Sequence, residues 1–169
     1  NYWGNASGPH HPNNPSYLNG TGDNISGNVD FIPWLNAPYP DGKAINYWNP
    51  TSSGTGQQEI NETEDADTVI NITTTAPVDV TVQNYSENPA GTGLTGGAQA
   101  VGNYIDVNVS NPSAVIWPIE IHIYYTQADL DALNITEDQI IGMYYWDGSN
   151  WVLYHHCLLY TSDAADDMQ

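Results

Sequence analysis

Apolar residues recur at every second position between residues 60 and 154, and this alternation limits the fold more than any other feature of the chain. In the clearest run, Ile119, Ile121 and Ile123 alternate with Glu120 and His122. Similar runs are Val69–Thr73, Val78–Gln83 and Tyr104–Val109. Successive side chains of a strand point to opposite faces of its sheet, so each run buries one face and leaves the other in water. The chain is therefore predicted to be mainly β, with an antiparallel, immunoglobulin-like β-sandwich over residues 60–156.

One segment of this region breaks the period of two. Thr126 precedes the apolar pair Leu130 and Leu133, and Asp129 follows Thr126 by three residues. A Thr hydroxyl and an acidic side chain at this spacing satisfy backbone N–H groups at the start of a helix. The sequence therefore predicts one short helix.

Residues 143–154 consist of two aromatic-rich stretches separated by the turn-forming residues Asp147–Asn150. This spacing predicts a hairpin with a four-residue loop that aligns Trp146 with Trp151 and places Tyr144 on the same face. We expect these side chains to pack as a cross-strand cluster, so that Trp151→Ala costs about 3–5 kcal/mol. In the alternative, Tyr144, Trp146 and Trp151 form an exposed platform that stacks on sugar rings.

Residues 1–45 are rich in Gly, Pro and Asn, which mark repeated turns. Their one strand-like run, Asn28–Ile32, stops at Pro33, and a segment this short cannot bury a core by itself. The following residues, 46–59, include the small polar stretch Asn49–Gly56, which is typical of a flexible linker.

Four motifs follow one another in residues 1–35: Asn1-Tyr2-Trp3-Gly4, Ser7-Gly8-Pro9-His10, Gly20–Ser26 and Val29–Leu35. This series resembles the closing rung of secreted right-handed parallel β-helix repeat proteins, which are related to periplasmic copper-binding and pectate-lyase-like families. The resemblance implies that residues 1–45 are the C-terminal cap segment of such a solenoid, with its coils upstream of Asn1. The apolar end of a solenoid needs a cover, which Trp3, Phe31, Trp34 and Leu35 would provide.

The motifs Ile121–Thr126, Asp129-Leu130 and Ile141–Val152 are similar to β-sandwich modules of large archaeal and bacterial surface proteins of the S-layer-like kind. Such modules serve as structural spacers and usually continue with further strands. The resemblance therefore implies an archaeal or bacterial surface protein. It also implies that the module over residues 60–156 is truncated before its closing strands.

Residues 157–169 break the character of the preceding sequence, because they run from a short apolar patch into small acidic residues. This tail resembles the translated read-through of a sequencing adapter. We therefore expect a non-native tail on a metagenomic fragment that is truncated at both ends. The tail contains Cys157, the only cysteine, so we expect no disulfide in the remaining chain.

The charge of the chain restricts its partners. Its formal net charge is −19, and Lys43 is its only Lys or Arg. Nucleic-acid binding needs cations that displace counterions from phosphates, so this class of function is excluded. No apolar run approaches about 18 residues, which argues against a membrane span. We expect an extracellular or cell-surface location, with other surface-protein domains or cell-surface glycans as partners.

The sequon Asn-x-Ser/Thr occurs more often than the composition predicts, since chance would give roughly three such sites. The candidate glycosylation sites are Asn5, Asn19, Asn24, Asn61, Asn71, Asn84, Asn108 and Asn134. In the alternative, Asn and Thr co-occur only because both are common in turns and strands.

No cluster of residues specifies catalysis or metal binding. The adjacent His10 and His11 would point to opposite faces of a strand, and we expect both imidazoles to be solvated in a loop. The densest acidic group lacks the spacing of a Ca²⁺ loop and is expected to be a solvated segment. It comprises Glu59, Glu62, Glu64, Asp65 and Asp67.

These observations predict a protein that is not an enzyme, with no catalytic, cofactor-binding or metal-binding residues. A single Lys and no Arg leave no lyase-type base, and no pair of carboxylates stands out as a glycosidase dyad. The leading hypothesis is an extracellular structural or adhesive module of a cell-surface protein. The alternatives are an accessory glycan-binding region of a secreted polysaccharide-active β-helix enzyme, and a glycan-binding adhesin.

Overall fold

The structure of the chain, a computed structural model, describes residues 1–102 and 104–154. It divides into two compact units, Asn1–Pro89 with Asn103–Ile123 and Ala90–Gly102 with Tyr124–Gln169, and each unit is described by itself. The predicted tail, residues 157–169, and the pair His155-His156 lie outside the described residues. No described helix is long and apolar enough to cross a membrane.

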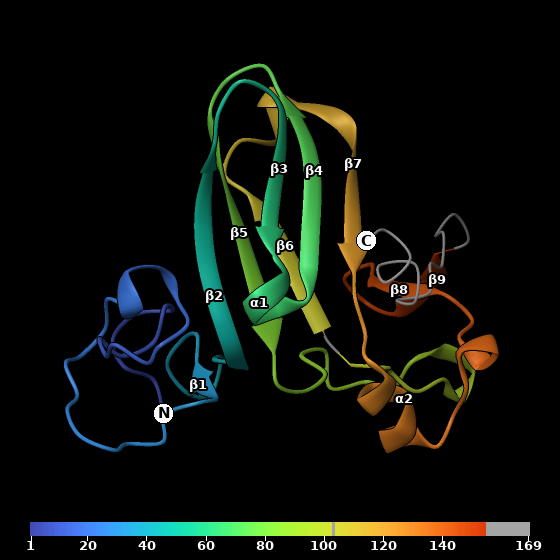
Figure 1. Cartoon of the computed structure of the whole chain (residues 1–169), viewed down its shortest axis with the longest axis horizontal. Coiled ribbons are helices and arrows are strands. Elements are labelled where there is room, and N and C mark those ends of the chain that lie inside the picture. Colours follow the sequence, from blue (N-terminus) through green and yellow to red (C-terminus); the bar gives the residue numbers. More distant parts are fainter. Residues whose placement is uncertain (103, 155–169) are drawn as a thin grey trace, which may run out of the picture. The chain divides into compact units, whose positions relative to one another are not determined.

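Two antiparallel sheets face each other in the first unit (Figure 1), which confirms the prediction of a mainly β fold. One sheet has the order β1-β2-β5-β6 and the other has the order β3-β4-β7. Their strands are Trp34–Leu35 (β1), Ala44–Ser53 (β2), Gly56–Glu62 (β3), Thr68–Thr74 (β4), Val78–Tyr85 (β5), Tyr104–Val109 (β6) and Val115–Ile123 (β7). The short helix α1 (Thr63–Ala66) connects β3 to β4, and 3-10 turns lie at Tyr17–Asn19 and Pro112–Ala114.

The alternating aliphatic residues form the core between the two sheets. Val80 and Val82 of β5 and Ile70 of β4 are fully buried, and β5 alternates between buried and more exposed residues along its whole length. Burying each such side chain contributes about 1.5–3 kcal/mol. The strands predicted over residues 69–73, 78–83 and 104–109 are confirmed as β4, β5 and β6.

Residues 46–59, predicted as a flexible linker, lie mostly in the strands β2 and β3. Strand β2 pairs with β5 from Ile45 to Ser53, with one irregularity between Ile45 and Tyr47. The polar residues of β2 do not make it flexible, because Asn49 and Thr51 donate hydrogen bonds to Glu62 of β3. The paired backbone and these side-chain hydrogen bonds order the stretch in spite of its polar composition.

The turns at one end of the sandwich are hydrogen-bonded to one another. The Thr74 hydroxyl donates to the Gly54 carbonyl at 2.7 Å, and the Thr75 N–H donates to the Ala114 carbonyl at 2.8 Å. These two bonds join the β2–β3, β4–β5 and β6–β7 connections into one ordered group of turns.

The edge strand β7 departs from regular pairing with β4. Asn71 pairs with Glu120 and Thr73 pairs with Ile116, so three residues of β7 lie opposite one residue of β4. The bulge contains Pro118, which has no N–H to offer a further strand. Bulges and prolines of this kind protect sheet edges from pairing with other chains.

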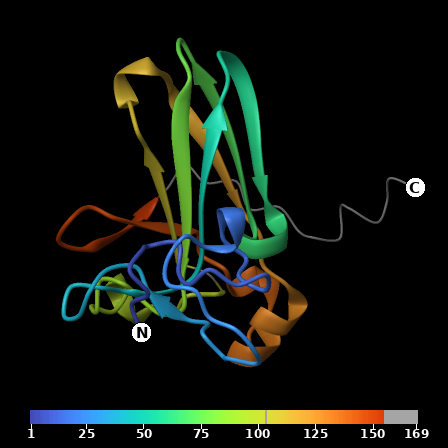
Figure 2. The same ribbon diagram turned by 90° about the vertical axis from the view of Figure 1, so that its left-hand side faces the viewer.

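The N-terminal segment, residues 1–43, is built largely from turns (Figure 2). Trp34 is fully buried, and its Nε1–H donates to the Ala6 carbonyl at 2.7 Å. With Phe31 and Ile45 it forms a second core. The strand predicted over Asn28–Ile32 does not form, and β1 begins only after Pro33, which cannot donate to a ladder.

Buried polar side chains and close glycine contacts hold the N-terminal segment together. Asn14 is 3% exposed, and its Nδ2 donates to the carbonyls of Ser7 at 3.0 Å and Pro9 at 2.7 Å. At Gly22 an added Cβ atom would lie 2.2 Å from the Trp3 carbonyl oxygen. Together with isolated backbone hydrogen bonds between the loops, these contacts order the segment.

The second unit contains the predicted helix as α2 (Gln127–Leu133). The Thr126 side chain accepts from the Asp129 N–H, and the Asp129 carboxylate accepts from the Thr126 N–H, which confirms the predicted capping box. Leu130 is buried and anchors the helix. The other elements of this unit are 3-10 turns at Thr95–Gly97 and Glu137–Gln139 and the strands β8 (Met143–Trp146) and β9 (Trp151–Tyr154).

Candidate functional site

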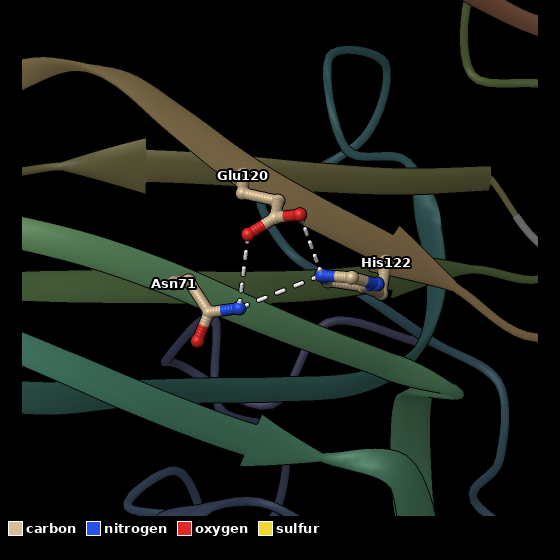
Figure 3. A network of polar contacts seen from close by, with 3 residues as sticks. All are labelled: Asn71, Glu120 and His122. Atoms are coloured by element: carbon tan, nitrogen blue, oxygen red, sulfur yellow. Dashed lines mark hydrogen bonds and ion pairs between the residues drawn. The ribbon is translucent and has the colours of Figure 1, made fainter. Parts of the chain in front are cut away.

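A polar network lies on the outer face of the three-stranded sheet, where β4 and β7 pair (Figure 3). Glu120 Oε1 lies 3.3 Å from His122 Nε2, and Asn71 Nδ2 lies 3.3 Å from Glu120 Oε2. Asn71 Nδ2 also lies 3.5 Å from His122 Nε2. The strand register brings the three side chains together, because Asn71 pairs with Glu120 and His122 follows two residues later on the same face.

The protonation of His122 decides which hydrogen bonds this network makes. When Nε2 carries a proton it donates to Glu120, and Asn71 then presents a second donor to the same nitrogen. When Nε2 lacks the proton it can accept from Asn71, but it then faces a carboxylate oxygen. The Glu120 side chain is 67% exposed and that of His122 is 31% exposed, so water screens the pair. Such a network adds little to stability.

A second polar cluster lies between the inner faces of β2 and β3. Asn49 Nδ2 and Thr51 Oγ1 donate to Glu62 Oε1 at 2.9 and 3.0 Å, and the Tyr47 hydroxyl donates to Glu62 Oε2. Burial, together with the adjacent Glu62 carboxylate, raises the pKa of Tyr47 far above its ordinary range. Three donors therefore satisfy one carboxylate, and the cluster ties the two sheets together.

The acidic residues around β3 do not converge on one point. Glu62 turns toward β2, Glu59 is exposed, and Asp67 ends α1 in the left-handed conformation with φ 48°. Burial, and next the charges of Glu62 and Glu64, raise the pKa of Asp65. No three metal-ligating side chains gather anywhere in residues 1–102 and 104–154. The expectation of a solvated segment is therefore wrong for Glu62, which its β2 partners hold inside the sandwich.

His10 and His11 have different environments. His11 is 9% exposed, its ring meets the Phe31 ring edge-on at a centroid distance of 5.4 Å, and its Nδ1 accepts from the Asn13 N–H. The prediction that both imidazoles are solvated is wrong for His11, because the loop folds it against a residue 20 positions away. His10 is exposed, and its Nδ1 lies 3.0 Å from the Gly20 carbonyl.

The hairpin of β8 and β9 has the predicted register, with Trp146 opposite Trp151 and Tyr144 opposite Leu153. The two Trp rings lie 5.5 Å apart between centroids and are inclined by 59°. The Tyr144 hydroxyl donates to the Thr95 carbonyl at 3.3 Å, and the Thr95 hydroxyl donates to the Trp151 carbonyl. The 3-10 turn at Thr95–Gly97 therefore contacts the hairpin at two points, the Trp151 backbone and the Tyr144 side chain.

These contacts bear on the predicted sugar platform. Trp146 is 38% exposed, whereas Tyr144 and Trp151 are half-buried. Two rings inclined by 59° do not make one flat surface for a sugar ring. The more exposed Tyr145 and Tyr154 lie on the other face of the hairpin, with their ring planes at 85°. The geometry is that of a cross-strand pair.

The candidate glycosylation sites differ in exposure. Asn84 is 4% exposed on the inner face of β5, and Asn5 and Asn71 are half-buried. The exposed asparagines are Asn19, Asn24, Asn61, Asn108 and Asn134. The folded chain has no room for a glycan at Asn84, because the attached sugar would have to occupy the core.

Sequence reasoning missed the carboxylate cluster around Glu62 and the network around Asn71. One signal was available for the first, because Tyr47, Asn49 and Thr51 alternate at the period of a strand. The second depends on the register between β4 and β7, two strands that lie far apart in the sequence.

Comparisons with protein-family models, with curated proteins and with solved structures found no match to the chain. Its function must therefore be argued from its own geometry and sequence.

Proposed function

We propose that this chain is a structural or adhesive module of an extracellular, cell-surface protein of archaea or bacteria. The observation that carries the proposal is the continuity of β2. Ile45, near the start of β2, pairs with Trp34 of β1 and belongs to the N-terminal core, while the rest of the strand pairs with β5 in the sandwich. One strand therefore runs through both cores of the first unit without a flexible joint. A rigid structural module requires this kind of continuity.

The finer identities that we propose are an immunoglobulin-like sandwich and, for residues 1–45, the cap of a parallel β-helix. The two antiparallel sheets around one core support the first assignment. The second rests on the sequence resemblance, and the parallel bridge between His10 and Asn24 is compatible with it. The net charge of −19 suits a solvated cell-surface environment.

Limited proteolysis of the folded full chain tests the structural proposal. A protease of broad specificity should leave residues 46–53 and 56–59 uncut until the first unit unfolds, because both strands there are paired. Early cleavage within these ranges would show a flexible joint and would overturn the proposal. Cleavage outside them serves as the control that the protease is active.

The second candidate function is glycan binding by the hairpin, which the exposure of Trp146 favours. A glycan array probed with the full chain and with Trp146→Ala tests it. Trp117→Ala is the matched control, because Trp117 is 58% exposed on β7 in the other unit. Binding that Trp146→Ala abolishes and Trp117→Ala preserves would establish the glycan-binding function. A purely structural module should show no binding by any of the three.

A further inference from the structure

We propose that Asn61 carries an N-linked glycan in the folded chain, and that this glycan shields the free edge of strand β3. The inference rests on the proposed cell-surface function, which places the chain where glycosylation occurs. It goes further by assigning a glycan to one of the eight sequons and by giving that glycan a role.

The side chains of Asn61 and Thr63 lie together on the surface where β3 passes into α1. Asn61 Oδ1 accepts from the Thr63 N–H at 3.1 Å and from the Thr63 hydroxyl at 2.8 Å. The Asn61 side-chain oxygen is therefore held against the backbone of Thr63. The Nδ2 atom, on the other side of the same carboxamide, points away from that backbone. Both Asn61 and Thr63 are exposed. A transferase therefore meets the acceptor nitrogen and the Thr hydroxyl together.

Other sequons combine these two properties less well. Ser7, the hydroxyl residue of the Asn5 sequon, is fully buried and hydrogen-bonded to Thr21. The Asn71 amide is engaged by Glu120 and His122. In the Asn134 sequon, the Thr136 hydroxyl is held by Asp138 at 2.6 Å instead of facing the asparagine. The Ser110 hydroxyl of the Asn108 sequon accepts from the Asp79 N–H.

The position of Asn61 on an edge strand gives its glycan a role. Among residues 1–102 and 104–154, strand β3 has only β4 as a neighbour in its sheet, and its pairing is regular from Gly56 to Glu62. The opposite edge of the same sheet, β7, is protected by the bulge around Pro118. Strand β3 has no such irregularity, and a regular free edge invites pairing with another chain. A bulky, soluble glycan near the end of β3 supplies the missing protection.

The modification is a group transfer from a lipid-linked oligosaccharide diphosphate. The Asn61 Nδ2 atom forms a bond to the anomeric carbon of the sugar, and the bond from that carbon to the phosphate oxygen breaks. The lipid diphosphate leaves with the electron pair, and the proton lost from Nδ2 passes to a carboxylate of the transferase.

Secretion of the full chain from a eukaryotic host, followed by intact-mass and glycopeptide mass spectrometry, tests the site. Thr63→Ala removes the sequon hydroxyl but keeps the acceptor residue Asn61, and this variant should lose one glycan. Thr63→Ser keeps a hydroxyl and should keep the glycan. Ser86→Ala, which removes the buried Asn84 sequon, is the matched control and should lose none. Equal glycan numbers in the wild type and in Thr63→Ala would overturn the assignment.

Sedimentation of the same secreted proteins tests the role of the glycan. Thr63→Ala should associate at concentrations where the wild type and Thr63→Ser remain monomeric. If the variant lacks the glycan but stays monomeric, the shielding role is wrong. Neither result changes the outcome of the proteolysis test, so a failure of this inference is distinct from a failure of the structural proposal.

Discussion

The N-terminal segment and the sandwich reach the same degree of burial by different means. In the sandwich, Val80 and Ile70 are fully buried within continuous ladders of backbone hydrogen bonds. In the N-terminal segment, Trp34 is equally buried, but isolated backbone hydrogen bonds between loops, together with side chains such as Asn14, hold the surrounding backbone. A ladder spreads its stabilisation over many similar bonds, whereas a looped core depends on a few that have no substitute. Single substitutions should therefore cost more per residue in the N-terminal segment.

The largest effect is expected for Trp34→Ala. The substitution empties a fully buried site and leaves the Ala6 carbonyl without its donor, so the free energy of unfolding should fall by about 3–5 kcal/mol. Chemical denaturation followed by circular dichroism measures it. Trp117→Ala, at a side chain that is 58% exposed, is the control and should change stability by at most about 0.5 kcal/mol. If the two variants lose similar free energies of unfolding, the burial of Trp34 does not stabilise the N-terminal segment.

Gly22→Ala should have the next largest effect. The backbone of Gly22 does not have the positive φ that favours glycine, so the substitution tests close packing alone. A Cβ atom 2.2 Å from the Trp3 carbonyl and 2.6 Å from the Gly8 carbonyl must displace backbone, which should cost about 1–3 kcal/mol. Gly93→Ala is the matched control, because its Cβ would meet nothing within 4 Å. If both variants melt at the same temperature, the close contacts do not hold the segment.

Glu62→Gln tests a part of the sandwich that relies on side-chain hydrogen bonds, as the N-terminal segment does. The Glu62 carboxylate accepts hydrogen bonds on both oxygens, whereas glutamine has an NH₂ group, itself a donor, in place of one of them. The free energy of unfolding should therefore fall by about 1–2 kcal/mol. Glu59→Gln, on an exposed residue of the same strand, should be close to neutral. Thermal melts of the two variants decide the matter, and an equal loss would mean that the cluster around Glu62 carries no special stability.

The smallest effect is expected from alkaline titration of Tyr85, which packs against the N-terminal core from β5. Burial, and next the Asp106 carboxylate, raise the pKa of Tyr85 from its ordinary value of 10.0 to about 12. The unfolded chain therefore loses this proton at lower pH than the folded chain. The corresponding stability is fully present below about pH 10 and is lost as the pH rises through about 12.

Urea titrations across this pH range, on the wild type and on Tyr85→Phe, measure the contribution of Tyr85. Above about pH 10 the urea midpoint of the wild type should fall relative to that of Tyr85→Phe, because phenylalanine has no proton to lose. A difference that stays constant with pH would contradict the assigned pKa shift. Tyr47, whose pKa is raised further, titrates beyond this range.

The sequence predicted those elements whose cause is local. The period of two in Val78–Gln83 gave β5, and the spacing of Thr126 and Asp129 gave the capped helix α2. Residues 46–59 were wrongly predicted because the polar side chains of β2 are satisfied by Glu62, which lies on another strand. The burial of His11 depends likewise on Phe31, a partner that no nearby residue indicates. Of the candidate site, the outward position of His122 could be predicted, but its meeting with Asn71 depends on the register of two distant strands.

The alternating directions of β2 to β7 decide where this unit can be attached to other parts of a protein (Figure 1). An even number of strands, each reversing the last, returns the chain to its starting side, so Ala44 and Ile123 lie at one end of the sandwich. Whatever precedes or follows these strands joins at that base. The tied turns at Gly54, Thr75 and Ala114 form the opposite tip, which no covalent connection to a neighbour occupies. The sandwich is thus built as a projection, with an ordered tip presented away from its own points of attachment.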